Sequence, residues 1–484
     1  MKKTVLKFVA AGLIFASGFC FAETIRNSKA KKNEYMNLIS SVFDFIDRNY
    51  VDEVDPKVLY EGAMRGLLSS LDDPHTTYLD AHDWSSLNDT TKGDFGGVGL
   101  TISKPVKSTP EKPAFVEVSS PIEDCPGYKA GIQAGDLIIA INGNSTEPMT
   151  MDEVLSKLRG TIGESVDVRI RRGKSMEFDR TLVRAKIEVP TVKFSKIEGT
   201  NIGYIRIIEF TPKTADRFQD ALDSLNVSGY SKLIIDLRNN PGGLITSVRD
   251  VADKFIDEGT IVSTKSRISY DNTNYVANKE NTKVRNIPIV VLINKGSASA
   301  SEILSGALKD YKLAYLVGEN SYGKGSVQNP IPLYNNDGFK ITIAKYYTPS
   351  DTNIDKVGIP PDREILYPEF TEEEEKSFIK LQEDNVIAKH VELNPSMSEH
   401  DIYLYAKQLT STYKLEERIL RKLIRNEAEK IKPARVYDLD YDLQLVGAID
   451  ILNKENFHQL MKNSKTLKEL QAEREEKKAA EENK

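Results

Sequence analysis

Between residues 187 and about 370, short apolar runs alternate with amphipathic stretches, and this alternation restricts the possible folds more than any other feature. The expected strands cover 204–208, 233–237 and 289–293, and the expected helices cover 215–225, 244–255 and 299–311. Apolar runs joined by helices are typical of strands that are buried on both faces of a parallel sheet. The sequence therefore predicts an α/β domain built on a buried, largely parallel sheet.

The N-terminus has the pattern of a secretory signal peptide. Lysines precede an apolar stretch over 8–21, and Cys20 and Ala22 are the small residues that a cleavage site after Ala22 requires. The stretch is shorter than the ~20 residues that a membrane span needs, and a retained membrane anchor is the alternative. We expect an exported protein of the periplasm or cell envelope, associated with the membrane if the signal sequence is retained.

The other segments differ from the α/β core in character. A helix is expected over 56–71. It is followed by a small β-rich module, which contains one amphipathic helix over 151–158. The charged composition of residues 465–484 indicates a solvated helix or a disordered tail. The expected domains are a signal peptide over 1–22, a helical region over 23–92, the β-rich module over 93–186, the α/β core over 187–370, and a helical region with a charged tail over 371–484.

Charge and cysteine content exclude several classes of function. The formal net charge is -6, whereas binding to nucleic-acid phosphates needs a basic face, so we expect no nucleic-acid partner. Only Cys20 and Cys125 occur, which excludes a cysteine-rich zinc site and a disulfide-dense scaffold. We expect no metal and no cofactor.

A candidate nucleophile lies where an apolar strand ends in a turn of small residues and a helix begins. Ser299 stands at this junction, followed by Ala300. The unpaired N–H groups and the dipole at a helix N-terminus favour negative charge, which suits an activated hydroxyl and an oxyanion hole. The alternative is an ordinary helix-capping serine.

A serine nucleophile needs a base, and the α/β core contains no histidine. The five histidines are His75, His82, His390, His400 and His458. Lys324 lies between two glycines that allow close backbone approach, and a lysine acts as a base where burial lowers its pKa from about 10.4. The alternative is a solvated loop lysine.

Gly242 and Gly243 follow the strand over 233–237 and can present N–H groups to a carbonyl oxygen, or form an ordinary strand-to-helix turn.

Several motifs together resemble the carboxy-terminal processing peptidases, also called tail-specific proteases. The motifs are G-S-A-S-A-S-E from Gly296, G-K-G-S-V-Q from Gly323, D-L-R-N-N-P-G-G from Asp236, N-Y-V-D from Asn49, L-D-D-P-H-T-T-Y from Leu71, Y-Y-T-P from Tyr346 and G-I-P-P-D from Gly358. The resemblance covers about residues 38–365 and implies a crotonase- or tricorn-core-like protease domain.

This resemblance implies a Ser/Lys dyad. By analogy Ser299 attacks the scissile carbonyl, Lys324 takes its proton, and Gln328 orients the lysine. The N–H of Ala300 and one N–H from Gly242 or Gly243 would form the oxyanion hole. Asp310 matches an aspartate to which a function is assigned in some relatives. It is eleven residues from Ser299, roughly 16 Å along a straight helix, so we expect a structural role.

Residues 93–186 resemble a PDZ domain. Its carboxylate-binding loop corresponds to Gly96, Gly97, Val98, Gly99 and Leu100. A peptide would add as a strand beside residues 100–102, and Val154 and Leu158 would line the groove. This mode selects free C-termini; the alternative is a module that only spaces the domains.

The sequence therefore predicts an exported serine endopeptidase that binds exposed C-terminal tails through a PDZ domain and cuts with a Ser/Lys dyad. The alternative is a catalytically silent PDZ scaffold on a protease fold, which would be expected to have lost Ser299 or Lys324, yet both are present. Hydrolysis of another bond by the same pair is a third hypothesis. By analogy with relatives, the terminal helices suggest a homo-oligomer, and a regulatory partner is a further expectation.

Overall fold

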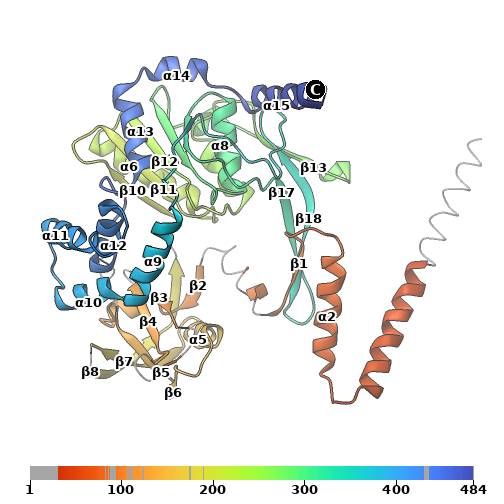
Figure 1. Ribbon diagram of the computed structural model, residues 1–484. Helices are drawn as coiled ribbons and strands as arrows, with labels where there is room; N and C mark the ends of the chain where they lie inside the picture. The colour runs from red at the N-terminus through yellow and green to blue at the C-terminus, as the bar shows by residue number, and fades with distance from the viewer. Residues whose placement is uncertain are drawn as a thin grey trace, which may run out of the picture. The chain divides into compact units, whose positions relative to one another are not determined.

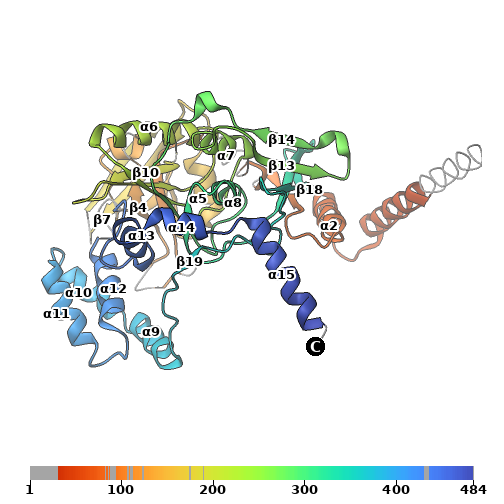
Figure 2. The same ribbon diagram turned by 90° about the horizontal axis from the view of Figure 1, so that it is seen from above.

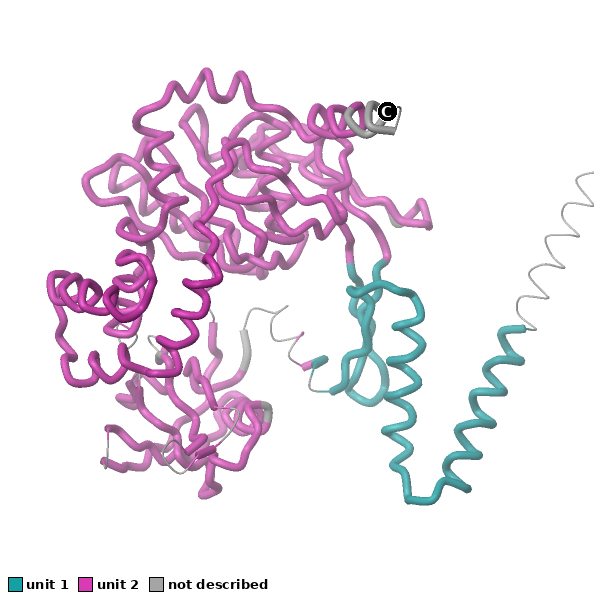
Figure 3. Tube along the Cα trace, in the orientation of Figure 1, with its two compact units in different colours: residues 1–84, 328–342 teal, residues 85–327, 343–484 magenta. Residues whose placement is uncertain are grey.

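The computed structural model describes residues 31–482 except 82, 86, 88–93, 106–107, 110–112, 123–124, 134, 174–175, 189 and 430–434. The chain divides into two compact units, residues 1–84 with 328–342, and residues 85–327 with 343–484 (Figure 3). Each unit is described by itself. The expected signal peptide over 1–22 lies outside the described residues.

The described part of the smaller unit contains helices together with strand β1 (Thr77–Leu79) and segments of β17 (Ser326–Pro332) and β18 (Gly338–Tyr347). Residues 31–49 are helical, and α2 (Pro56–Ser69) follows, with Asp55 accepting a hydrogen bond from the Lys57 N–H at its N-cap. Asp residues are favoured at this position because they satisfy an N–H group that has no partner within the helix. Strand β1 (Thr77–Leu79) pairs antiparallel with residues 338–340, which begin β18 (Gly338–Tyr347).

The larger unit contains a six-stranded sheet with helices on both faces (Figure 1). Its strands, in spatial order, are β10 (Val192–Lys196), β11 (Ile202–Ile207), β12 (Lys232–Asp236), β15 (Ile289–Ile293), β16 (Tyr315–Gly318) and β19 (Arg363–Glu364). Only the β10–β11 pairing in this sheet is antiparallel. The expected parallel sheet is therefore confirmed.

Alternate residues of the central strands pack on opposite faces of this sheet. Leu233 and Ile235 lie in the cluster that contains helices α6 (Thr214–Ser228), α7 (Ile245–Ala252) and α8 (Ala300–Asp310). Ile234, between them in sequence, packs with α13 (Leu443–Lys454) in a separate cluster. Figure 2 shows α6 and α13 on opposite sides of β10.

The core also carries an antiparallel ribbon that the sequence patterns did not predict. Strand β13 (Thr260–Ser266) pairs with β14 (Thr273–Val276) and with residues 344–347 of β18. Strand β17 (Ser326–Pro332) also pairs with β18.

The β-rich module has its own sheet and core. The sheet order is β3 (Leu100–Ser103), β4 (Val116–Pro121), β5 (Leu137–Ile141), β7 (Ser165–Arg172) and β8 (Met176–Val183), and β6 (Asn144–Ser145) pairs with β5. Strand β2 (Asp94–Gly97) pairs separately with β9 (Ala185–Glu188). Helix α4 (Pro126–Lys129) is short, and a capping box of Thr150 and Glu153 begins α5 (Met151–Leu158). Strand β3 is an edge strand of this sheet.

The C-terminal region is helical, as expected. Helices α9 (Glu372–Asp384), α10 (Val386–Leu393), α11 (Glu399–Leu409) and α12 (Glu417–Glu429) form a separate apolar cluster, and α14 (Phe457–Asn463) and α15 (Leu467–Glu482) follow α13. The segment over 465–484 was expected to be a solvated helix or a disordered tail. Its residues 467–482 form α15, and Leu467 packs in the core of the six-stranded sheet. Within the described residues, no helix is both long and apolar enough to span a bilayer.

Candidate active site

Ser299 lies in the turn between β15 and α8 with an uncommon backbone conformation. Its φ is 54° and its ψ is -113°. Positive φ is unfavourable for a residue with a Cβ and persists where the surrounding structure enforces it. The Tyr346 hydroxyl donates a hydrogen bond to the Ser299 carbonyl (3.2 Å), and the Ser299 N–H donates to Glu302 (2.8 Å). Hydrogen bonds therefore hold the Ser299 backbone at both its carbonyl and its N–H group.

The Glu302 carboxylate joins the turn that contains Ser299 to the loop that contains Lys324. Its Oε2 accepts hydrogen bonds from the N–H groups of Ser299 (2.8 Å) and Lys324 (2.9 Å). Its Oε1 accepts from the Ser321 hydroxyl (2.6 Å) and the Gly323 N–H (2.7 Å). The backbone nitrogens of Ser299 and Lys324 are therefore neighbours around one oxygen. Burial raises the pKa of Glu302, and these four donors oppose that rise.

Sequence reasoning did not single out Glu302. The signal was present, because Ser299 and Glu302 have the spacing of a capping box at the start of a helix. The full burial of its side chain could not be read from that spacing.

The two glycines beside Lys324 allow its loop to lie directly on a neighbouring segment. A Cβ on Gly323, whose φ is 90°, would lie 2.9 Å from the Gly358 nitrogen, and one on Gly325 would lie 2.6 Å from the Asp355 nitrogen. The Lys356 N–H donates to the Gly323 carbonyl (2.8 Å). Side chains at either position would therefore displace the loop. Lys324 itself is half-buried.

The loop after β12 packs against the turn that contains Ser299. A Cβ on Gly242 would lie 2.7 Å from the Ala298 carbonyl oxygen and 2.8 Å from the Ala300 nitrogen. The carbonyl of Asn240 accepts from the Ala298 N–H (3.0 Å) and from the Ser301 hydroxyl (2.9 Å). The structure thus brings the glycine loop and the serine turn together.

The two candidate glycines of this loop differ in the state of their N–H groups. The Gly242 N–H donates to Asn240 Oδ1 (2.9 Å), and the Gly242 carbonyl accepts from the Phe210 N–H (2.8 Å). Within the described part of the chain, the N–H groups of Gly243 and Ala300 have no acceptor. The Gly242 N–H is therefore already engaged, whereas those of Gly243 and Ala300 have no partner among the described residues.

A buried ion-pair network holds the start of the glycine loop. Arg238 pairs with Asp236 at the end of β12 (2.6 Å) and with Asp442 from the C-terminal region (2.6 Å). The Tyr204 hydroxyl donates to Asp236 (2.7 Å), and the Tyr367 hydroxyl donates to Asp442 (2.9 Å). Burial, followed by the charge of Asp442, raises the pKa of Tyr367 to about 12. The pairing of Arg238 with Asp442 was not predicted from the sequence.

Two other residues, Gln328 and Asp310, were also considered from the sequence. Gln328 is on β17 within the smaller unit, where its amide donates to the Thr342 hydroxyl (3.2 Å). Asp310 ends α8, and its carboxylate accepts from the N–H groups of Ser350 (3.0 Å) and Leu467 (2.8 Å). Asp310 therefore holds the start of α15, in keeping with a structural role.

The glycine loop of the β-rich module leads into the edge strand β3. Gly99 has a φ of 69°, and a Cβ there would lie 2.1 Å from the Cys125 Cβ. The Gly96 carbonyl accepts from the Gly160 N–H (3.1 Å), whereas the N–H groups of Val98 and Gly99 have no acceptor among the described residues. Val154 and Leu158, expected to line a groove, are 0% and 4% exposed and pack in the core of the module.

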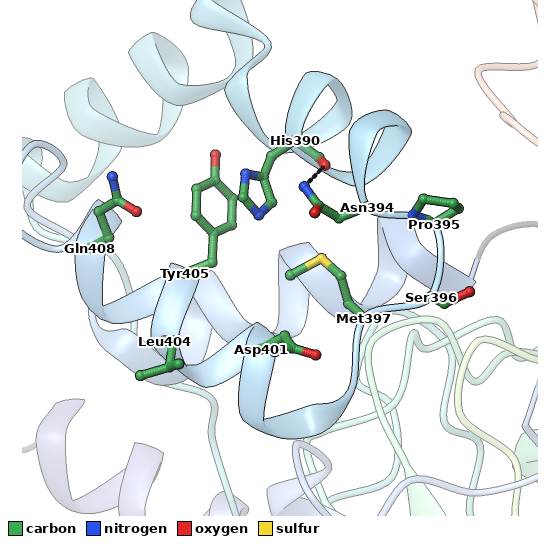
Figure 4. A pocket seen from close by; sticks show the side chains of 9 residues that line it. All are labelled: His390, Asn394, Pro395, Ser396, Met397, Asp401, Leu404, Tyr405 and Gln408. Atoms are coloured by element: carbon green, nitrogen blue, oxygen red, sulfur yellow. Dashed lines mark hydrogen bonds between the residues drawn. The ribbon is translucent and has the colours of Figure 1, made fainter.

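A separate cavity of about 550 Å³ lies on α10, α11 and the segment between them (Figure 4). The His390 and Tyr405 rings stack there with 3.5 Å between centroids, and the Asn394 amide donates to the His390 carbonyl (2.9 Å). None of the residues predicted for catalysis lines this cavity. In the part of the chain that the structure describes, no cluster of three or more His, Cys, Asp or Glu side chains is arranged to hold a metal ion.

Three models of known protein families match parts of the chain. Residues 201–365 match the model of peptidase family S41, residues 117–172 match a PDZ domain, and residues 20–83 match the activating protease CtpB N-terminal domain. The fold and the site therefore define a serine-type peptidase with a PDZ domain.

Relatives along most of the chain identify the family. The chain is 39% identical over 378 residues to the carboxy-terminal-processing protease of Bartonella bacilliformis, covering 76% of this chain and 84% of that protein. It is 32% identical over 370 residues to the carboxy-terminal processing protease CtpB of Bacillus subtilis, covering 75% of each. The solved photosystem II D1 C-terminal processing protease matches with 31% identity and a TM-score of 0.40, over 68% of this chain and 92% of that one. The chain belongs to peptidase family S41, among the carboxy-terminal processing proteases.

Proposed function

We propose that this peptidase is exported, captures polypeptides by a free C-terminus on its PDZ domain, and hydrolyses them with a Ser299/Lys324 dyad. The observation that carries the proposal is the shared carboxylate of Glu302, which binds the backbone of both residues. Export rests on the signal-peptide pattern of residues 1–22.

In this mechanism Ser299 Oγ attacks the scissile carbonyl carbon while Lys324 Nζ takes the hydroxyl proton. The carbonyl oxygen becomes an oxyanion, which the N–H groups of Gly243 and Ala300 bind, since these two have no acceptor among the described residues. Lys324 then gives the proton to the leaving amine, and water hydrolyses the acyl-enzyme. Gln328 orients the lysine, by analogy with the family.

The PDZ domain supplies substrate selection. The N–H groups of Val98 and Gly99 would bind a terminal carboxylate, and the tail would add as a strand to the unpaired edge of β3. Val154 and Leu158 are largely shielded by the module core, so we assign the first contacts to the loop over 96–100 and to β3.

We expect cleavage to depend on the charge of the substrate's C-terminus. An unfolded reporter with an apolar tail should be cleaved, and amidation of its terminal carboxyl should raise KM about 10- to 100-fold, because hydrogen bonds to a charged group are worth about 1.5–3 kcal/mol. Cleavage is followed by gel and mass spectrometry, with Ser299→Ala as the control for contaminating proteases. Equal KM for both reporters would contradict carboxylate capture, and cleavage that persists in Ser299→Ala would contradict the dyad.

We also propose that a second copy of the chain covers the N-terminal helix over 31–49. Large apolar side chains, more than half exposed, recur along one face of this helix at Tyr35, Leu38, Ile39, Val42 and Phe45. Spacings of three, four and seven residues place them on a single stripe. A stripe of this kind marks an interaction surface.

Charges on this stripe are expected to dissociate the oligomer. Ile39→Glu with Val42→Glu should lower the mass measured by light scattering to that of the monomer. Asn37→Glu with Ser40→Glu, on the opposite face of the helix, should leave the mass unchanged. A monomeric wild type, or equal effects of both variants, would contradict the assignment of this face.

A further inference from the structure

We propose that Glu302 is a positioning residue that holds the serine turn and the lysine loop as one hydrogen-bonded unit. This inference rests on the proposed function, because it concerns the geometry of the same dyad. It adds a residue that neither attacks the substrate nor moves its proton.

The Glu302 carboxylate is saturated with donors. Each of its oxygens accepts two hydrogen bonds, from Ser299, Ser321, Gly323 and Lys324, over 2.6–2.9 Å. A carboxylate offers about four lone-pair sites, so none remains for a substrate. Three of the four partners are N–H groups, which can only donate, and the fourth is the Ser321 hydroxyl. Glu302 therefore acts through the groups it holds and not on the substrate.

The hydrogen bonds of Glu302 oppose two sources of disorder in the site. The first is the strained backbone of Ser299, whose N–H is bound by Glu302 Oε2. The second is the freedom of the glycines around Lys324, whose loop is bound through the N–H groups of Gly323 and Lys324. Because one side chain fixes both, a shift of either segment changes the separation between nucleophile and base. A misplacement of about 1 Å can cost 100-fold in rate.

The opposite end of α8 offers a matched control. Asp310 also accepts two backbone N–H bonds, from Ser350 and Leu467, but neither partner belongs to the serine turn or the lysine loop. Asp310→Asn should therefore lower stability and leave the geometry of the dyad intact.

The test compares Glu302→Gln with Asp310→Asn in the full chain. Glutamine keeps the shape but turns an NH₂ group toward N–H donors. For Glu302→Gln we expect kcat to fall about 100-fold or more, with KM and the Kd for a C-terminal peptide changed less than about threefold. Labelling of Ser299 by a fluorophosphonate should slow in parallel. Asp310→Asn should lower the melting temperature with kcat within about threefold of wild type.

Several results would overturn the proposal. One is a wild-type kcat and labelling rate in Glu302→Gln while Ser299→Ala and Lys324→Ala are inactive. Another is an equal loss of kcat in Asp310→Asn at the same loss of stability. If Glu302→Gln does not fold, Ser321→Ala is tested instead, because it removes one of the four hydrogen bonds to Glu302. We expect kcat of this variant to fall about 3- to 10-fold, and an unchanged kcat would refute the proposal. Activity that survives Ser299→Ala and Lys324→Ala instead removes the proposed function, and this inference with it.

Discussion

Replacing Lys324 with alanine is expected to abolish peptide hydrolysis while binding of C-terminal peptides to the PDZ domain stays unchanged. The serine hydroxyl is a weak nucleophile until a base removes its proton, and no histidine occurs in the α/β core over 187–370 to replace the lysine. We expect kcat to fall by at least about 1,000-fold, and the double variant with Ser299→Ala to be no worse than either single one, because members of a catalytic unit are not additive.

The measurement is steady-state cleavage of a C-terminally free peptide, with peptide binding followed separately by fluorescence anisotropy. Lys295→Ala is the matched control, since Lys295 is an exposed lysine in the turn that precedes Ser299. Retained activity in Lys324→Ala, or a comparable loss in Lys295→Ala, would contradict the assignment of Lys324 as the base.

The second large effect is expected on stability, from Arg238→Met. The Arg238 side chain is 11% exposed, and its partners Asp236 and Asp442 are 2% and 17% exposed. Removing one member of a buried ion pair leaves uncompensated charge and costs about 3–5 kcal/mol. The protease domain should therefore melt roughly 10 °C lower. Arg169→Met is the control: its bidentate pair with Asp179 is exposed and screened by solvent, so the melting temperature should stay close to that of the wild type.

The same network sets the direction of a pH effect. Burial raises the pKa of Asp442, but the hydrogen bonds and charge of Arg238 outweigh burial and hold that pKa below the ordinary value of 3.8. A carboxyl whose pKa is lowered by folding stabilises the protein above that ordinary value and loses this contribution as the pH falls below it. In Arg238→Met the loss of stability that Asp442 causes at low pH should disappear. If the melting temperatures of wild type and Arg238→Met fall equally as the pH is lowered, Arg238 does not set the pKa of Asp442.

Apolar patterning predicted the elements that bury a continuous run of side chains. The strand over 289–293 and the helix over 151–158 have the predicted bounds, because each is both uniformly patterned and bounded by turn residues. The ribbon of β13, β14 and β18 was not predicted. Its strands carry mixed polar and apolar residues, and what fixes their structure is pairing with segments far away in the sequence.

The candidate site also contains residues that could be predicted from the sequence and contacts that could not. Ser299 and Lys324 stand in local motifs that can be recognised in sequence, and so the hypothesis of a dyad needed no structure. The Gly242 N–H is engaged because the Asn240 side chain accepts a hydrogen bond from it. Arg238 is held by Asp442, which is 204 residues away in the sequence. Contacts of this kind are made by the folded chain and leave no periodic trace in the sequence.

The unpaired edge of β3 has a consequence for the enzyme at rest. The main-chain N–H and C=O groups of this edge can pair with any extended segment. Without a bound tail, the PDZ domain can therefore also pair with unfolded chains and with other copies of itself. A bound tail blocks that pairing. In the proposed mode of tail binding, substrate covers this edge, and we expect concentrated protein without substrate to be the form most prone to edge-to-edge association.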